Sequence, residues 1–451
     1  MFPTIKKSIA GLIAAAAVML AALPAMAAVD GETAYVFNTF SFLFNGALVM
    51  WMAAGFAMLE SGLVRAKNTA TICLKNIALY SIAGIMFYIV GYSLMYTDVS
   101  GYIGSFAFFY NPSEAELALL GADEATDAMV GAVVEGGYSV ASDWFFQMVF
   151  VATAASIVSG TLAERIKLWP FLIFVIVLTT FIYPIQGSWT WGGGWLAEKG
   201  FSDFAGSTIV HSVGGWAALT GALILGSRKG KYGPDGRVNP MPGANLPLAT
   251  LGTFILWLGW FGFNGGSQLA LGSALDATAM AIVFTNTNLA AAGGVVAAML
   301  MTQALYKKVD LTMALNGALA GLVSITAGPD LTNHLMSIII GGIGGVLVVI
   351  AIPMLDRFKI DDVVGAISVH LVAGIWGTLA VGIFGAGDIG VQIIGILAIA
   401  VFVIVSSSIV WLALKYTIGI RVSDEDEDAG LDMVELGLEA YPEFGRGSQR
   451  G

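Results

Sequence analysis

Charge and cysteine are scarce in this sequence. Only 11% of its 451 residues are charged and 57% are hydrophobic, whereas ordinary soluble domains are about 25% charged. So few charges cannot cover a water-soluble globule of this size, which excludes a soluble enzyme or a disordered scaffold and leaves a polytopic membrane protein. Acidic residues outnumber basic residues by 31 to 20, which argues against a nucleic-acid partner. The single cysteine, Cys73, excludes an internal disulfide and a thiolate metal cluster.

Both ends of the chain differ from the apolar middle. Residues 1–27 have the pattern of a secretory signal peptide, because two lysines precede an apolar run at residues 9–23 and an Ala-Met-Ala cleavage motif follows. The alternative is an uncleaved first span, but the run is short and polar residues follow the motif. Residues 421–451 are polar and acidic. They form either a solvated tail or a docking and regulatory segment.

Eleven apolar stretches lie between these ends, and each is close to the ~20 residues that a helix needs to cross about 30 Å of hydrocarbon. The sequence therefore predicts an all-α membrane protein with eleven transmembrane helices. Their approximate ranges are 34–62, 73–97, 143–163, 169–190, 206–226, 247–265, 278–305, 311–327, 333–354, 363–385 and 391–418. We expect one membrane domain at residues 28–420, with repeat halves at 34–226 and 247–385 and a final span at 391–418.

The basic residues give these spans a direction. Outside the leader there are eighteen Lys and Arg residues, and seventeen of them fall at odd-numbered gaps or at the C-terminal end. Only Lys199 lies in an even-numbered gap. Because basic residues gather on the cytoplasmic side, we expect an external N-terminus and a cytoplasmic C-terminus. The long acidic segment at residues 98–143 would then lie outside, either as a solvated loop or as a cap over an entrance.

Two segments that close the predicted halves resemble each other. Residues 203–226 read DFAGSTIVHSVGGWAALTGALILG, and residues 362–385 read DVVGAISVHLVAGIWGTLAVGIFG. Both begin with Asp, with Gly three residues later and His eight residues later. Each half contains five spans, an odd number, so the halves enter the membrane in opposite directions. The sequence thus predicts an inverted five-plus-five repeat, an architecture of transporters whose substrate path lies at the repeat interface.

The spacing places one histidine of each half near the middle of the membrane. Eight helical residues rise about 12 Å, close to half of the ~30 Å hydrocarbon thickness. His211 and His370 should therefore meet near mid-depth, facing the protein interior because a polar ring facing lipid is costly. The alternative is two unrelated buried histidines, each bonded to a backbone carbonyl. His334, the third histidine, is interpreted as an interface residue.

The histidines do not suggest an enzyme or a metal site. The nearest acidic candidates, Glu60 and Asp203, are expected at other depths, so no carboxylate would orient or activate the imidazoles. Two imidazoles without a third ligand make a poor zinc or iron site. No catalytic residue, metal or cofactor is therefore expected. A pair of imidazoles does supply a proton donor and a proton acceptor, which suits a path for a solute that gains or loses a proton.

Aromatic residues near the outer ends of several spans form a second candidate site. Trp191 precedes three glycines, Phe150 ends the motif FFQMVF, and Phe263 and Ser267 lie in GWFGFNGGS. Aromatic faces attract cations, and Trp does so best, so an indole with a hydroxyl nearby could recruit a small cation. Asp203 begins its helix, where a carboxylate caps free N–H groups. Capping is favoured there over direct contact with substrate.

These motifs together resemble the ammonium transporters of the Amt/Mep/Rh group. The resemblance covers the mature chain and rests on the motifs GLVRAKN, SGTLAERI, WGGGWL, DFAGSTIVH, GWFGFNGGS and GAISVH, which occur in family order. It implies eleven spans, an inverted repeat and a homotrimer with one pore per subunit. The long acidic loop and residues 328–334 (GPDLTNH) depart from the family pattern.

The resemblance also implies roles for individual residues. Trp191, Phe150 and Ser267 look like the external ammonium site, with Asp203 beside it, and Trp191 and Ser267 favour the Amt branch. Phe150 with Phe263 looks like the phenyl gate. His211 and His370 look like the twin histidines of an apolar pore for ammonia.

Three functions stay open at this point. The favoured one is ammonium uptake, with or without transfer of the proton. The first alternative is an ammonium sensor with little flux, and the second is a carrier for a neutral solute such as urea or water. The tail is similar to family tails that meet a PII-type nitrogen-signalling protein.

Overall fold

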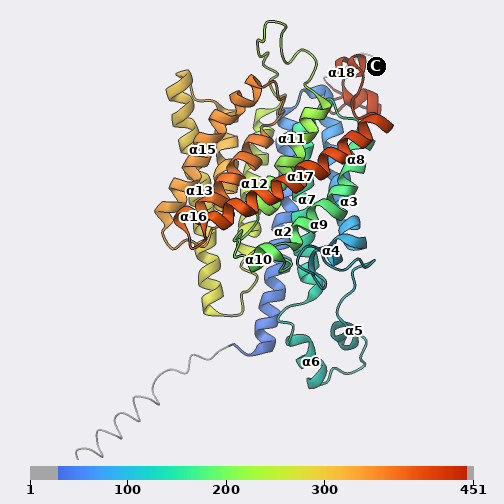
Figure 1. Ribbon diagram of the computed structural model, residues 1–451, viewed down its shortest axis with the longest axis vertical. Helices are drawn as coiled ribbons and strands as arrows, with labels where there is room; N and C mark the ends of the chain where they lie inside the picture. The colour runs from blue at the N-terminus through green and yellow to red at the C-terminus, as the bar shows by residue number, and fades with distance from the viewer. Residues whose placement is uncertain (1–28, 444–451) are drawn as a thin grey trace, which may run out of the picture.

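The computed structural model describes residues 29–443, and all regular structure in that range is helical (Figure 1). The only extended pairings there are two isolated bridges, between Ile166 and Arg421 and between Tyr232 and Val238. The predicted signal peptide at residues 1–27 lies outside the described residues. The all-α class is therefore confirmed.

Ten helical segments within residues 29–443 are long and apolar enough to span a membrane. Uninterrupted α-helices form six of them: α2 (Gly31–Leu63), α7 (Val140–Leu162), α12 (Leu246–Gly266), α13 (Ala274–Tyr306), α15 (His334–Arg357) and α17 (Ile389–Thr417). An eleventh apolar helix, α14 (Leu311–Ile325), is shorter. Every residue of α14 from Ala314 onward is buried, so protein rather than lipid surrounds it and it need not match the full membrane thickness. The predicted count of eleven is confirmed.

The other four spans combine α-helix with a π-helical turn. The first consists of η1 (Ala66–Asn68), α3 (Thr69–Met86), η2 (Phe87–Gly91) and α4 (Tyr92–Tyr96). The second consists of α8 (Leu168–Val177), η3 (Leu178–Ile182) and α9 (Tyr183–Ser188). The third is η4 (Ser207–Ser212) with α11 (Val213–Leu225), and the fourth is η5 (Ile367–Val372) with α16 (Ala373–Phe384). The η1 segment is a 3₁₀ turn, and η2 to η5 are π-helical. Because π turns occur often at functional sites, the two that carry histidines, η4 and η5, are of special interest.

The packing of η4–α11 against η5–α16 is the arrangement that the predicted inverted repeat requires. The α-helix of each half lies against the π turn of the other, so the two segments run side by side in opposite directions. Glycines allow this approach: a Cβ on Gly215 would lie 2.6 Å from Leu371 Cβ, and one on Gly374 would lie 2.5 Å from Ser207 O. Larger residues at either position would separate the halves.

The acidic segment after α4 is folded rather than a simple solvated loop. It contains α5 (Glu114–Leu120) and α6 (Asp127–Val134), which lie at the lower end of the molecule (Figure 1). Ser113 and Glu116 form a capping box on α5, a reciprocal arrangement that satisfies two free N–H groups. Glu116 Oε1 also accepts a hydrogen bond from Val140 N at the start of α7. The short helix α10 (Trp195–Glu198) lies in the next gap on this side.

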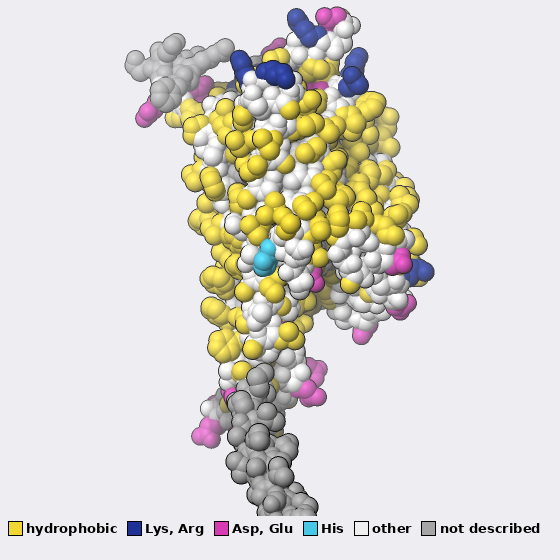
Figure 2. Space-filling view, turned by 90° about the vertical axis from the view of Figure 1, so that its left-hand side faces the viewer, with side chains coloured by type: hydrophobic (Ala, Val, Ile, Leu, Met, Phe, Trp, Pro, Cys, Tyr) yellow, Lys and Arg dark blue, Asp and Glu magenta, His cyan; other side chains and the backbone are white. Residues whose placement is uncertain are grey.

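The opposite end of the molecule carries the tail. Residues beyond α17 form α18 (Asp424–Ala429) and the π turn η6 (Asp432–Leu436), seen at the upper end in Figure 1. Figure 2 shows Lys and Arg side chains gathered at this end and a broad hydrophobic belt around the middle. This distribution is that of a multi-pass membrane protein.

Candidate functional site

Two buried histidines contact each other across the repeat halves. Nδ1 of His370 lies 3.1 Å from Nδ1 of His211, and the ring centroids are 5.2 Å apart. The exposed fractions are 0% for His211 and 3% for His370. One Nδ1 must carry the proton and donate it, and the other Nδ1 must accept it. One imidazole of the pair is therefore the hydrogen-bond donor and the other is the acceptor.

Each histidine owes its position to a π turn that an aspartate caps. His211 N donates to Gly206 O at 3.0 Å, the i to i−5 bond that widens the turn. The Asp203 carboxylate accepts hydrogen bonds from four successive backbone N–H groups, those of Gly206, Ser207, Thr208 and Ile209, at 2.8–3.1 Å. Burial raises the pKa of Asp203, and these four N–H groups oppose that rise. The carboxylate is therefore occupied by its own helix, as the capping interpretation expects.

The second repeat half has the same arrangement, with its capping aspartate at the opposite side of the membrane domain. The Asp362 carboxylate accepts hydrogen bonds from Ala366 N and Ile367 N and from the Thr161 hydroxyl. Burial raises the pKa of Asp362 to about 6. Thus one cap from each side fixes the entry of a histidine-bearing segment.

Aromatic rings line the histidine pair. The Trp260 indole lies over His211 with centroids 4.9 Å apart and planes inclined by 19°, and Phe56 lies 6.1 Å from the His370 ring. Trp260 Nε1 donates to the Thr326 hydroxyl at 2.8 Å, so its polar edge points away from the imidazole. His211 Nε2 is buried and has no hydrogen-bond partner. The surroundings of the pair are thus apolar.

A stacked pair of phenyl rings continues the aromatic column. Phe150 and Phe263 have centroids 4.0 Å apart and planes inclined by 28°, and both are buried. Phe263 also stacks on His211 at 5.2 Å. The rings of α7 and α12 therefore close the space directly beside the first histidine.

Trp191 forms the end of the column that lies farthest from His370 along the series of ring contacts. Its ring meets Phe150 edge-on with centroids 6.0 Å apart, and its Nε1 donates to Asp203 O at 3.0 Å. Gly206, with φ of 106°, allows the close approach, because a Cβ there would lie 3.1 Å from the indole and 2.4 Å from the Val210 side chain. The half-buried indole keeps part of its surface accessible.

Ser267 lies one turn beyond Phe263, at the end of α12. Its hydroxyl donates to Phe263 O at 2.8 Å and is only partly buried, so the oxygen lone pairs remain available. The structure brings Trp191, Phe150, Phe263, His211 and His370 into one continuous series of ring contacts.

One expectation about this region is wrong. The sequence suggested that no carboxylate would lie near the histidines, yet Glu60 of α2 lines the same small cavity as His370. The register of α2 against η5 depends on tertiary packing, which the sequence alone does not reveal. A lone glutamate late in an apolar span was the available signal. Trp260, inside GWFGFNGGS, was also overlooked.

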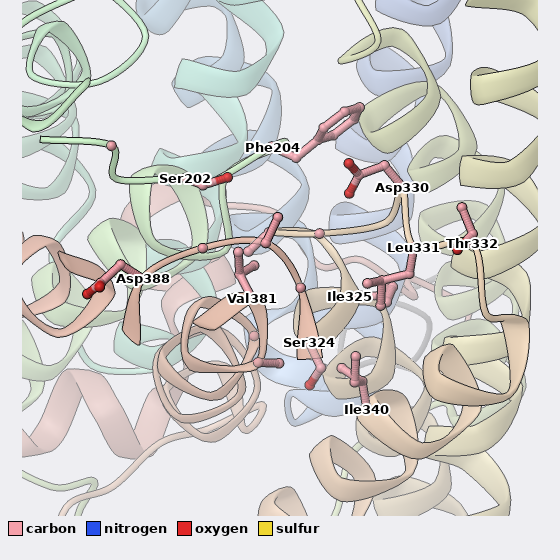
Figure 3. Close-up of a pocket in the computed structure, with 18 of the residues that line it drawn as sticks. Ser202, Phe204, Ser324, Ile325, Asp330, Leu331, Thr332, Ile340, Val381 and Asp388 are labelled. Carbon is pink, nitrogen blue, oxygen red and sulfur yellow. The ribbon is translucent and has the colours of Figure 1, made fainter. Parts of the chain in front are cut away.

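Other predicted features lie away from the column. His334 Nδ1 lies 2.7 Å from Asn286 Oδ1, at the start of α15. The unusual turn at residues 328–334 contributes Asp330, Leu331 and Thr332 to a separate cavity of about 580 Å³ (Figure 3). Neither feature contacts the histidine pair. Residues 29–443 contain no group of three or more His, Cys, Asp or Glu side chains placed to hold a metal ion.

Comparison with known proteins gives a consistent result. A family model described as the Ammonium Transporter Family matches residues 40–441. Ammonium transporter Amt2 of Archaeoglobus fulgidus is 41% identical over 434 residues, covering 89% of this chain and 87% of that protein. The ammonium transporter of Bacillus subtilis is 33% identical over 422 residues, covering 89% and 97%.

Solved structures resemble the fold as well. A structure titled Sensor Amt Protein matches with a TM-score of 0.80 and 36% identity, covering 89% of this chain and 99% of that one. Mep2 of Candida albicans matches with a TM-score of 0.75 and 27% identity, covering 88% and 89%.

Proposed function

The chain belongs to the ammonium transporter family, and we propose that it takes up ammonium by conducting ammonia through the aromatic and histidine column described above, with the proton relayed by the histidines. The observation that supports this proposal best is the unbroken series of rings from Trp191 to His370. It combines a cation-attracting entrance, a closed apolar constriction and a proton-sharing pair in one line.

In this proposal Trp191, Phe150 and Ser267 bind the incoming ammonium. The indole and phenyl faces attract a cation, and the Ser267 oxygen accepts a hydrogen bond from it. Asp203 supports the site indirectly, because its carbonyl holds the indole N–H while its carboxylate holds η4. The phenyl pair of Phe150 and Phe263 acts as the gate.

Selectivity then follows from the chemistry of the two competing ions. Ammonium and potassium have similar size and charge, so a wide polar pore would not separate them. A bare charge in the middle of a membrane is costly. Ammonium avoids this cost by giving up a proton, whereas potassium has none to give. The buried imidazole pair provides an acceptor for that proton.

The direct test measures currents in proteoliposomes on a solid-supported membrane, with ammonium, methylammonium and potassium gradients. We expect ammonium-evoked current in the wild type, and loss of proton-coupled current or a gain of potassium leakage in His211→Ala and His370→Ala. Wild-type selectivity and current in both variants would contradict the relay. Uptake without competition by methylammonium would instead favour a carrier for a neutral solute.

Orientation and assembly belong to the same proposal. By the positive-inside rule, the basic end that carries the tail faces the cytoplasm, and Trp191 therefore faces the exterior. The membrane in this proposal is the cell inner membrane. We propose a homotrimer with one pore per subunit, and a PII-type signalling protein as a partner of the cytoplasmic face. Mass measurement in detergent and pull-down with the full chain test these two points.

A sensor with little flux is the second candidate, and the docked tail favours it. The Asp432 carboxylate accepts hydrogen bonds from Ala70 N and Thr71 N at the start of α3, and the Lys67 ammonium donates to the carbonyls of Glu427 and Asp428. Such contacts would report changes in the spans to a partner. Ammonium flux no higher than that of empty liposomes would support the sensor over the transporter.

A further inference from the structure

Glu60 is a buried carboxylate that the proposed function has not used. It lies on α2 and is 1% exposed. Phe56, four residues earlier on the same face, packs against the His370 ring. Four residues are about one helical turn, a rise of about 6 Å. Glu60 therefore lies roughly one turn farther than His370 toward the end of the molecule that carries the tail.

A small cavity connects the two side chains. Its volume is about 10 Å³, and Glu60, His370, Phe56, Ser156 and Asn316 are among the residues that line it. A space of roughly this size holds about one water molecule. A single water between an imidazole and a carboxylate is the usual means of moving a proton between groups that do not touch.

The two carboxylate oxygens of Glu60 differ in their surroundings. Oε2 accepts hydrogen bonds from the Ser159 hydroxyl at 2.7 Å and from Asn76 Nδ2 at 3.3 Å. Oε1 is buried and has no hydrogen-bond partner in the structure. Since a buried acceptor without a partner costs free energy, an orientation that leaves Oε1 free suggests that this oxygen has a transient partner.

The compensating charge near Glu60 is Lys75 of α3. Its ammonium is buried, donates to Ser159 O at 2.9 Å and lies 4.9 Å from the centre of the Phe171 ring. It interacts electrostatically with Glu60 and with Arg165. Ser159 bonds to both partners, through its hydroxyl to Glu60 and through its carbonyl to Lys75. Ser159 thus links the Glu60 carboxylate to the Lys75 ammonium without a direct ion pair between them.

The cavity also adjoins a route out of the protein. Asn316 and Val364 line both this cavity and a larger one of about 360 Å³. The larger cavity is also lined by Arg228, Lys231 and Asp356, at the end that carries the basic residues. Ammonia and a proton arriving beside His370 therefore have a polar exit on the Glu60 side.

We propose that Glu60 is the proton acceptor on the cytoplasmic side of the histidine pair, an inference that rests on the proposed function. The imidazolium of His370 gives its proton through one water to the Glu60 carboxylate, which leaves a neutral imidazole and a carboxylic acid. The acid then passes this proton to ammonia leaving the pore. Ammonium is formed again, and Glu60 returns to its carboxylate form.

The competing explanation is that Glu60 serves only to neutralise Lys75. Two variants separate the explanations. Glu60→Gln removes the acceptor and leaves Lys75 without its counter-charge, whereas the double variant Glu60→Gln with Lys75→Met removes both charges. If Glu60 is part of a proton relay, the ammonium-evoked current should stay low in both variants. If its role is purely electrostatic, the double variant should recover the current.

The experiment measures ammonium-evoked current in proteoliposomes, beside wild type and the conservative variant Glu60→Asp. We expect Glu60→Gln to lower the current by about tenfold or more, since a positioned acid–base group typically contributes on the order of 10²-fold. The double variant should stay equally low, and Glu60→Asp should keep a measurable current with an altered pH profile. If Glu60→Gln does not fold, the double variant and Glu60→Asp carry the test.

Two outcomes overturn the inference. One is a wild-type current in Glu60→Gln, and the other is recovery of the current in the double variant. Failure of the proposed function itself is distinguishable, because the wild type would then show no ammonium-evoked current at all. If the current is unchanged in Glu60→Gln but altered in His211→Ala and His370→Ala, the proton relay includes the histidines and excludes Glu60.

Discussion

The phenyl rings of Phe150 and Phe263 stack with centroids 4.0 Å apart. They come from different helices, α7 and α12, and Phe263 stacks on His211 with its centroid 5.2 Å away. Two rings at van der Waals distance leave no room between them for a hydrated ion. The column is therefore closed at this pair of rings in the structure, and passage requires at least one ring to move.

Removal of one of these rings should cost stability and open the column. Phe263→Ala should lower the free energy of unfolding by about 3–5 kcal/mol, as is typical for a buried Phe, and should raise potassium leakage. Thermal unfolding in detergent and ion flux in liposomes measure the two effects. Phe254→Ala is the matched control, because Phe254 lies on the same helix but is 61% exposed. Equal stability and leakage in the two variants would contradict the gate.

Trp191 should control the apparent affinity for ammonium. Loss of its ring in Trp191→Ala removes a cation–π contact of about 1 kcal/mol, which corresponds to a half-saturating concentration roughly fivefold higher. Trp191→Phe keeps an aromatic face, so its half-saturating ammonium concentration should lie between those of the wild type and Trp191→Ala. The concentration dependence of the ammonium-evoked current provides the measurement. An unchanged half-saturation in Trp191→Ala would remove the indole from the recruitment site.

The two capping aspartates allow a comparison between halves. Asp203→Ala leaves four buried N–H groups without their acceptor, and each unsatisfied group costs about 1–3 kcal/mol. Asp362→Ala removes the corresponding cap in the other half, away from Trp191, and leaves two N–H groups and the Thr161 hydroxyl without their acceptor. Both should lower the thermal unfolding temperature, but only Asp203→Ala should also raise the half-saturating ammonium concentration. Equal ammonium affinity in the two variants would argue against a role of Asp203 in holding Trp191.

Acid should destabilise the charged cluster of Arg165, Arg228 and Asp361, which come from the segments that follow α7, α11 and α15. Burial would raise the pKa of Asp361, but the Arg228 hydrogen bonds and the charges of Arg228 and Arg165 outweigh it and hold the pKa well below its ordinary value. Arg228 Nε and Nη2 donate to the Asp361 carboxylate at 2.9 Å. Because the folded-state pKa is depressed, the stabilisation is complete above the ordinary Asp pKa near 4 and is lost as the pH falls below it.

The measurement is the unfolding temperature in detergent between neutral and acidic pH. Asp361→Asn should be less stable than wild type at neutral pH and should lose less stability on acidification. Glu164 also contributes to the loss of wild-type stability in acid. The charges of Arg228 and Arg65 outweigh the effect of burial and lower the pKa of Glu164. Parallel pH curves for wild type and Asp361→Asn would contradict the assignment.

Asp432 should hold the tail against the membrane domain. Its carboxylate caps the start of α3 through Ala70 N at 2.9 Å and Thr71 N at 2.8 Å. Asp432→Ala should release this contact and speed proteolytic cleavage of the tail severalfold, with little change in the spans. Glu425→Gln is the control, because Glu425 is exposed on α18. Identical cleavage rates in the two variants would show that the cap does not hold the tail.

The sequence by itself determined the membrane class, the spans and the inverted repeat. These follow from local properties, namely the length of the apolar stretches, the sidedness of Lys and Arg, and the repeated Asp, Gly and His spacing. The capping role of Asp203 was also predictable, because it bonds to residues only three to six positions later.

Tertiary structure decided which atoms meet. His211 and His370 are 159 residues apart in the chain, and the approach of their Nδ1 atoms depends on how two helices rotate and slide against each other. The same holds for the stack of Phe150 on Phe263 and for the cavity shared by Glu60 and His370. Helix periodicity fixes the face and the depth of a side chain, but contacts between distant helices come from side-chain packing and close glycine approaches, which no local pattern encodes.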